Sequence, residues 1–145
     1  MEEVFVKSEQ GDKLKKLGFD WKCIYYYEGN GDYPSLRDSS HFLGKTYVSE
    51  FYHNFNDTTH RHGQPGYPRC SAPTLSQAQR WLREKKSIKV YIKPLFSSEQ
   101  YEYWISFQFK GYGGDEVYGV EHTWEKALSK GIDVALNLII NDSVK

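Results

Sequence analysis

The pattern of apolar and polar positions is most regular in the second half of the chain. Four apolar residues recur at the spacing of one helical face, namely Leu75, Ala78, Trp81 and Leu82. Thr74 and Gln77 form a capping-box pattern at the start of this segment. We therefore expect a helix over about residues 74–86, with Trp81 facing inward as a packing anchor.

Two segments after this helix alternate with the period of a β-strand. The first begins at Ile88 and reads IKVYIK, and the second begins at Tyr101 and reads YEYWISFQFK. The short linker Phe96–Gln100 predicts that they form an antiparallel hairpin. A third strand is expected at Val117–Glu121, after the glycine-rich turn GYGGDE.

A last helix is expected over about residues 123–140, where a wide apolar stripe runs along WEKALSKGIDVALNLI. Thr123 stands at its cap position. Gly131 lies inside the stripe and costs about 1 kcal/mol relative to alanine in a helix. Close packing against another element would explain this glycine.

The first half of the chain is less regular. SEQGDKLKKLGFD predicts a short amino-terminal helix that stops at Gly18, with Phe19 packing back on Leu14. KCIYYY predicts a strand. The segment Tyr33–Cys70 has loop chemistry in its second half, Glu50–Arg69, with a short strand expected at Lys45–Phe51.

The order of these elements predicts an α+β fold. We expect a largely antiparallel sheet of three to five strands, with the two longer helices (about 74–86 and 123–140) packed on one face and a short N-terminal helix. Residues 1–145 are expected to form a single domain with a long irregular excursion at about 33–70.

Composition limits the functions that this chain can have. The 19 Lys and Arg residues equal the 19 Asp and Glu residues, so the formal net charge is zero. Proteins that bind duplex nucleic acid through its phosphates usually carry a basic excess, so this balance argues against such a role. Aromatic residues make up 17% of the chain, which suits both a sheet-rich core and a binding face.

The amino terminus and the cysteines bear on the compartment. MEEVFVKSEQ contains no basic region followed by an apolar run, and no segment reaches the length of a membrane span. Cys23 and Cys70 are the two cysteines of the chain, and no disulfide is assumed between them. These features predict a cytoplasmic protein that does not enter a membrane.

Histidines gather in one segment and raise the possibility of a metal site. His53, His60, His62 and Cys70 lie within eighteen residues, and imidazole and thiolate are suitable zinc ligands. Their spacing, however, matches no established zinc pattern. The simpler interpretation is a polar surface loop that contains histidines, and zinc remains the alternative.

No combination of residues indicates a catalytic mechanism. Ser, Cys and His residues lack a nucleophile elbow or a cysteine-protease signature around them. The glycines in GNGD and GYGGDE lie between expected strands and lack the lysine and the helix start that a phosphate cradle requires. Hairpin turns explain these glycines, and we expect a protein that is not an enzyme and needs no cofactor.

The order helix, three strands, helix from Thr74 onward resembles the topology of double-stranded-RNA-binding domains. Those domains present lysines at the start of their last helix. Here the matching positions read HTWEKALSK, with Trp124 and Glu125 where cations are expected. The analogy therefore gives no support for duplex RNA binding.

Trp104 is a candidate binding residue. It alternates with the apolar positions of its strand, so it falls on the opposite face, among Glu102, Ser106 and Gln108. It could anchor a partner or stack on a ring-shaped ligand. Alternatively, the amino-terminal segment covers this face.

Three segments together resemble a known group of proteins. LKKLGFD, SAPTLSQAQRWLREKKSIKVYIKP and WEKALSKGIDVALNLI are similar to segments of small uncharacterised proteins encoded by phages and prophages of gut and environmental bacteria. The cluster Trp81-Leu82-Arg83-Glu84-Lys85 is the most specific part of the match. The resemblance implies a phage-related protein of the host cell cytoplasm, with no established activity.

These observations favour a small accessory protein that acts by binding a protein partner or a second copy of itself. One alternative is a module that binds a small phosphorylated ligand or nucleotide, with Trp104 for stacking and Arg61, Arg69 or Arg83 for phosphate. The other is a zinc protein built on the segment from His53 to Cys70.

Overall fold

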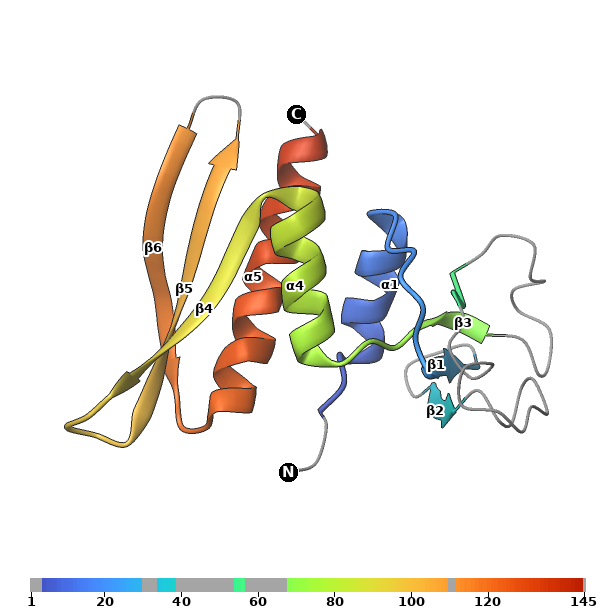
Figure 1. Cartoon of the computed structure of the whole chain (residues 1–145), viewed down its shortest axis with the longest axis horizontal. Coiled ribbons are helices and arrows are strands. Elements are labelled where there is room, and N and C mark those ends of the chain that lie inside the picture. Colours follow the sequence, from blue (N-terminus) through green and yellow to red (C-terminus); the bar gives the residue numbers. More distant parts are fainter. Residues whose placement is uncertain (1–3, 30–33, 39–53, 57–67, 110–111, 145) are drawn as a thin grey trace. The chain divides into compact units, whose positions relative to one another are not determined.

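The computed structural model describes residues 4–29, 34–38, 54–56, 68–109 and 112–144 (Figure 1). The chain divides into two compact units. The C-terminal unit comprises Met1–Val4 and Thr74–Lys145, and the N-terminal unit comprises Phe5–Pro73. The described parts contain three helices and two three-stranded antiparallel sheets, which confirms the predicted α+β class. The expectation of a single domain stays a prediction.

The C-terminal unit is a three-stranded sheet with helices on one face. Its elements are α4 (Leu75–Lys86), β4 (Ile88–Leu95), β5 (Gln100–Phe109), β6 (Tyr112–Glu121) and α5 (Trp124–Val144). The sheet order is β4-β5-β6, with both pairs antiparallel. Figure 1 shows α4 and α5 on the same side of this sheet, so one face is covered and the other, the outer face, carries no helix of this unit.

Helix α4 begins and ends as its sequence predicts. The Thr74 hydroxyl oxygen accepts a hydrogen bond from the Gln77 N–H at 3.1 Å. Ser87 takes the left-handed conformation (φ 55°) after the last helical residue, and β4 starts at the next position. Trp81 is only 2% exposed, so the prediction that it faces inward is confirmed.

Gly131 allows α5 to pack closely on the sheet. A Cβ atom on this glycine would lie 2.5 Å from Cγ1 of Val90 and 3.6 Å from Cβ of Tyr103. No real Cβ contact is that short, so any larger residue would push the helix away from the strands. The glycine inside the apolar stripe is therefore explained by close packing, as predicted. The cap at Thr123 is also confirmed, because its hydroxyl accepts the Lys126 N–H at 3.1 Å.

Strand β6 begins earlier than the sequence indicates. The expected strand started at Val117, but pairing with β5 starts at Tyr112 and includes Gly113 and Gly114. These glycines belong to the strand and not to a turn. Glycines weaken a strand but do not prevent ladder hydrogen bonds.

A bulge and a glycine shape the second half of β6. Tyr103 pairs with Gly119 and Trp104 pairs with Val117, so Tyr118 is an extra residue in the ladder. A Cβ atom at Gly119 would lie 2.5 Å from the Tyr103 hydroxyl oxygen. The Tyr103 ring thus covers this glycine from the neighbouring strand and occupies the place of its missing side chain.

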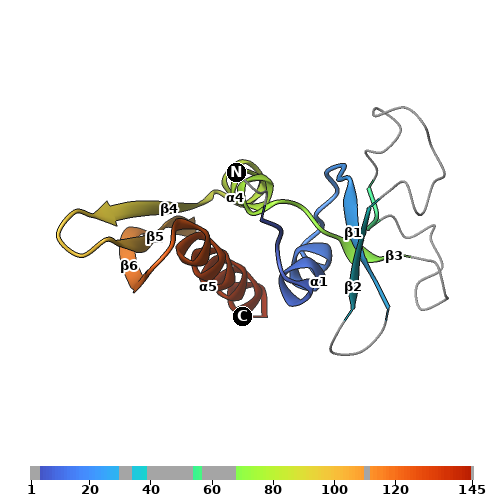
Figure 2. The same cartoon turned by 90° about the horizontal axis from the view of Figure 1, so that it is seen from below.

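The N-terminal unit contains α1 (Ser8–Lys16), β1 (Tyr25–Glu28), β2 (Ser35–Asp38) and β3 (Pro68–Ser71). Its sheet order is β2-β1-β3, again antiparallel, and α1 packs against β3 (Figure 2). The predicted helix stop is confirmed, because Gly18 has a φ of 92° and the Phe19 N–H bonds to the Leu14 carbonyl at 2.9 Å. Both Phe19 and Leu14 are buried.

Three short stretches of the excursion at about 33–70 are described by the structure, and they belong to this unit. Strands β2 and β3 lie at the two ends of this range, for which the sequence predicts an irregular excursion. Phe55 is fully buried with its ring centroid 4.7 Å from that of Tyr26, and its N–H donates to the Ser71 hydroxyl at 3.0 Å. The strand predicted at Lys45–Phe51 lies outside the described residues.

Candidate functional site

The outer face of the β4-β5-β6 sheet is the candidate functional site. Side chains alternate between the two faces of a strand, and the residues paired across the strands share a face. This rule assigns to the outer face Lys89, Tyr91 and Lys93 of β4, Glu102, Trp104 and Ser106 of β5, and Val120 of β6. The predicted position of Trp104, opposite the helix-covered face, agrees with this register.

An aromatic pair occupies the centre of the outer face. Tyr91 and Trp104 are directly opposite each other on β4 and β5. Their rings are stacked, with centroids 5.9 Å apart and planes inclined by 15°. Tyr91 is 36% exposed and Trp104 is half-buried. The two rings therefore form one apolar platform that still reaches solvent.

Charged groups hold the indole of Trp104 in place. The Lys93 ammonium nitrogen lies 5.8 Å from the centroid of the Trp104 ring, within the range of a cation–π contact. The indole N–H donates to the Glu102 carboxylate at 2.9 Å. Lys93 lies on the neighbouring strand β4 and Glu102 on the same strand as Trp104, so the sheet itself orients the ring before any ligand arrives.

Sequence reasoning identified Trp104 but missed its partners on β4. Lys89, Tyr91 and Lys93 alternate with the buried positions of that strand, so the period alone places them on its exposed side. What the period does not give is the register. Only the pairing of β4 with β5 shows that Tyr91 faces Trp104.

Phe96 is a second feature that sequence reasoning missed. It lies in the turn between β4 and β5 and is 97% exposed. A phenylalanine in the otherwise polar turn FSSEQ is a visible sequence signal. Isolated exposed apolar residues are common, but this side chain is close in sequence to the outer face and could extend it.

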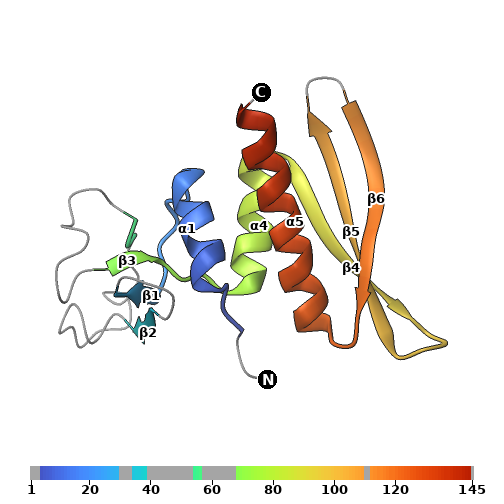
Figure 3. The ribbon, with the colours of Figure 1, turned by 180° about the vertical axis from the view of Figure 1, so that it is seen from behind.

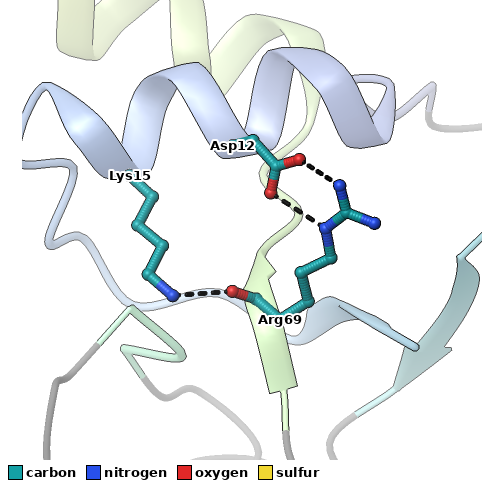
Figure 4. A network of polar contacts seen from close by, with 3 residues as sticks. All are labelled: Asp12, Lys15 and Arg69. Carbon is teal, nitrogen blue, oxygen red and sulfur yellow. Dashed lines mark hydrogen bonds and ion pairs between the residues drawn. The ribbon is translucent and has the colours of Figure 1, made fainter. Parts of the chain in front are cut away.

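Arg69 and Cys70, two predicted site residues, belong to β3 in the N-terminal unit. Figure 4 shows Arg69 facing Asp12 and Lys15 of α1. Arg69 binds the Asp12 carboxylate of α1 through two guanidinium nitrogens, and Nε lies 3.1 Å from Oδ1. The Lys15 ammonium donates to the Arg69 carbonyl at 2.8 Å. Burial lowers the pKa of Lys15. Arg69 therefore links α1 to β3, and a phosphate ligand would compete with Asp12 for it.

The Cys70 thiol is fully buried, with Asp12 and Arg69 nearby. Burial, together with the nearby Asp12 carboxylate, raises its pKa to about 12. A metal ligand must be a thiolate, so coordination would require this thiol to lose its proton in an unfavourable setting. A Cβ atom at Gly11 would lie 2.9 Å from the Cys70 sulfur, so the sulfur is also tightly packed.

The remaining predicted site residues are an arginine on α4 and four residues of the segment before β3. Arg83 is exposed on α4, in the C-terminal unit. Arg61 and the three histidines, His53, His60 and His62, lie outside the described residues. Within the ranges that the structure describes, no group of three or more potential metal ligands occurs. The zinc hypothesis stays a prediction.

Comparisons with protein-family models, with curated proteins and with solved structures found no match to this chain. Among the described helices, none is both long and apolar enough to cross a membrane.

Proposed function

We propose that this chain is a non-enzymatic accessory protein that binds a protein partner through the outer face of the β4-β5-β6 sheet. The observation that carries the proposal is the stacked and partly exposed pair of Tyr91 and Trp104 at the centre of that face. The resemblance to phage-encoded proteins adds a phage-related role as an expectation.

The composition of the outer face suits a protein interface. Tyrosine and tryptophan dominate the energetic centres of protein–protein contacts, and charged residues are usually found at the rim. Here Lys89 and Lys93 of β4 are exposed beside the aromatic pair, and Val120 of β6 is 42% exposed. An apolar centre with a charged border is thus present on one face.

Orientation of the indole before binding also favours this function. Freezing a flexible side chain at an interface costs about 0.5–1.5 kcal/mol. Trp104 already has its ring stacked on Tyr91 and its N–H bonded to Glu102. A partner therefore meets a fixed surface and pays less of this entropic cost.

A site-specific photo-crosslinking experiment tests the proposal. A photoreactive phenylalanine at position 91 is expected to trap one protein partner, or a second copy of the chain, in cells that express it. The same group at Trp124, which is exposed on α5, is the matched control. The proposal predicts that Trp104→Ala abolishes the adduct from position 91, since truncating a central aromatic residue often costs 2 kcal/mol or more, which is about 30-fold in affinity. An identical adduct from both positions would argue against it.

Nucleotide binding is the second candidate function. The specific observation that favours it is Lys93, whose ammonium group lies beside an aromatic ring that could stack on a base. A screen of nucleotides by thermal shift discriminates the two functions, because a ligand far above its dissociation constant must raise the stability of the fold. Stabilisation by a nucleotide that disappears in both the Lys93→Gln and the Trp104→Ala variant would support nucleotide binding at the outer face.

A further inference from the structure

The two edges of the β4-β5-β6 sheet differ in whether another strand can be added. On the β4 side, the Gln79 side-chain amide of α4 donates a hydrogen bond to the Val90 carbonyl. A carbonyl of a strand points either to the neighbouring strand or to the edge, so this bond shows that Val90 directs its backbone groups outward. Helix α4 therefore closes this edge at Val90.

Pro94 also prevents a further strand from pairing with β4. Within a strand, residues two apart direct their backbone groups to the same side. Pro94 is four residues beyond Val90 and thus faces outward too, and it has no N–H to offer a new strand. The exposed lysines Lys89 and Lys93 are further residues that discourage pairing at an edge.

In the part of the chain that the structure describes, neither a helix side chain nor a proline blocks the β6 edge. Its sequence, YGGDEVYGVE, contains no proline and no lysine. Among the described strands, β6 pairs with β5 alone, and Figure 3 shows β6 at the border of the sheet. The bulge at Tyr118 interrupts the ladder, so the regular part available to a new strand is the run from Tyr112 to Val117.

The register identifies the backbone groups of β6 that point away from β5. The backbone N–H and carbonyl of Val90 point away from β5, so those of its neighbour Tyr91 point toward β5 and bond to Trp104. Trp104 therefore directs its own backbone groups to β4. Ile105 then faces β6 and bonds to Glu116. Glu116 thus directs its backbone groups to β5, and Asp115, the residue before Glu116, directs its N–H and carbonyl to the opposite side, away from the sheet.

The charge of β6 indicates which strand fits there. The strand contains three acidic and no basic residues, among them the exposed Glu116. Two copies of β6 placed side by side would bring like charges together, which is unfavourable across paired strands. A strand with lysine or arginine side chains would instead form opposite-charge pairs.

We propose that the β6 edge accepts an extended, basic segment of a protein partner as a fourth strand. Such β-augmentation derives affinity from main-chain hydrogen bonds and specificity from alternate side chains. The inference rests on the proposed function, namely that the chain acts by binding a protein, and it adds where and how a basic segment of that partner is held.

A peptide experiment on the full chain tests the inference. The probe is a capped ten-residue peptide that alternates lysine with valine, and its counterpart has glutamate in place of lysine. Fluorescence anisotropy is expected to show binding of the lysine peptide at least about tenfold tighter than that of the glutamate peptide, since opposite charges attract across the edge. Equal affinity for the two peptides, or no binding of either, would overturn the inference.

Two variants separate backbone pairing from charge. Asp115→Pro removes the outward N–H, whereas Asp115→Thr loses the same charge and keeps that N–H. The lysine peptide should bind Asp115→Pro about tenfold more weakly than Asp115→Thr, and equal binding would contradict strand addition. In the unmodified chain, amide exchange at Asp115 should slow when the peptide binds while exchange at Glu116 stays unchanged, so the test does not depend on the variants folding.

The two proposals can fail separately. Trp104→Ala alters the outer face and leaves the β6 backbone intact, so it should retain peptide binding. Failure of the peptide tests, with the crosslink from position 91 intact, removes strand addition and leaves the outer face as the binding surface. Peptide binding without that crosslink rules out the outer face as the binding surface and leaves strand addition at the β6 edge as the mode of binding.

Discussion

Gly131 sets the distance between α5 and the sheet at the scale of a single residue. Gly131→Ala would improve helix propensity by about 1 kcal/mol, but the new methyl group would lie 2.5 Å from Cγ1 of Val90. Overpacking of this kind usually costs about 1–3 kcal/mol. We therefore expect a net loss of unfolding free energy in urea titrations. The exposed neighbour Lys130 provides the control, and Lys130→Ala should change stability by less than about 0.5 kcal/mol.

Cys70 makes stability depend on pH in the alkaline range. Its thiol has an ordinary pKa of 9.0, and burial in the fold raises this pKa to about 12. Below pH 9 the thiol is neutral in both states. Between these values the unfolded chain loses the proton while the folded chain keeps it, so the unfolding free energy falls as pH rises, by up to about 1.4 kcal/mol for each pH unit.

Chemical unfolding at several pH values tests this effect. The stability advantage of the unmodified chain over Cys70→Ala should shrink as the pH rises from 9 toward 12, because the variant lacks the titrating thiol. An advantage that stays constant over that range would show that Cys70 does not titrate as described.

The stop at the end of α1 is a further residue-scale feature. Gly18 has a φ of 92°, a conformation that costs a residue with a side chain about 1 kcal/mol. Gly18→Ala should lower the unfolding free energy by about that amount, as measured by thermal or urea unfolding. No other atom outside its immediate neighbours would lie within 4 Å of the added methyl group, so a much larger loss would contradict a purely conformational cost.

At the scale of elements, α4 supports β4 in two ways. Its apolar stripe covers the sheet, and the Gln79 amide satisfies the Val90 carbonyl at the edge. Gln79→Met keeps the length of the side chain but removes this donor, so we expect a loss of about 1 kcal/mol. Arg83→Met on the same helix is the control, since Arg83 is exposed, and urea unfolding of both variants is the measurement. Equal stabilities would show that the Val90 bond contributes nothing.

The elements of the C-terminal unit were largely predictable from the sequence. Helices α4 and α5 have long apolar stripes and caps at Thr74 and Thr123, and the β4-β5 hairpin has strict alternation. Local patterns of this length determine their own secondary structure, because each buried position repeats the same signal. The inward position of Trp81 followed from the same periodicity.

The remaining features depend on pairing between distant segments. Strands β2 and β3 have four residues each and form by pairing with β1, so their own sequences carry little signal. The glycines of β6 resemble a turn unless their pairing with β5 is known. For the candidate site, alternation placed Trp104 on the outer face, but the contact with Tyr91 and the bond from Gln79 to Val90 required the three-dimensional register.

At the scale of the whole molecule, the chain divides into two compact units. The large buried residues of the C-terminal unit, such as Trp81, Ile105 and Leu136, all lie between residues 74 and 145. We therefore expect a fragment of residues 74–145 to fold alone. Its thermal unfolding should be cooperative and its amide spectrum dispersed. Stability should fall by about 1 kcal/mol through loss of the bond from the Leu75 N–H to the Val4 carbonyl. A fragment without a cooperative transition would show that the core depends on the rest of the chain.

Closure of the sheet at Val90 and Pro94 also limits stoichiometry. A protein with two equally receptive borders can join others end to end and grow into a fibre without a natural stop. In this sheet the β4 edge is blocked by α4, through Gln79, and by Pro94, which has no N–H to donate. The β4-β5-β6 sheet can then take up a single strand, so assembly through this sheet should stop at one partner instead of polymerising.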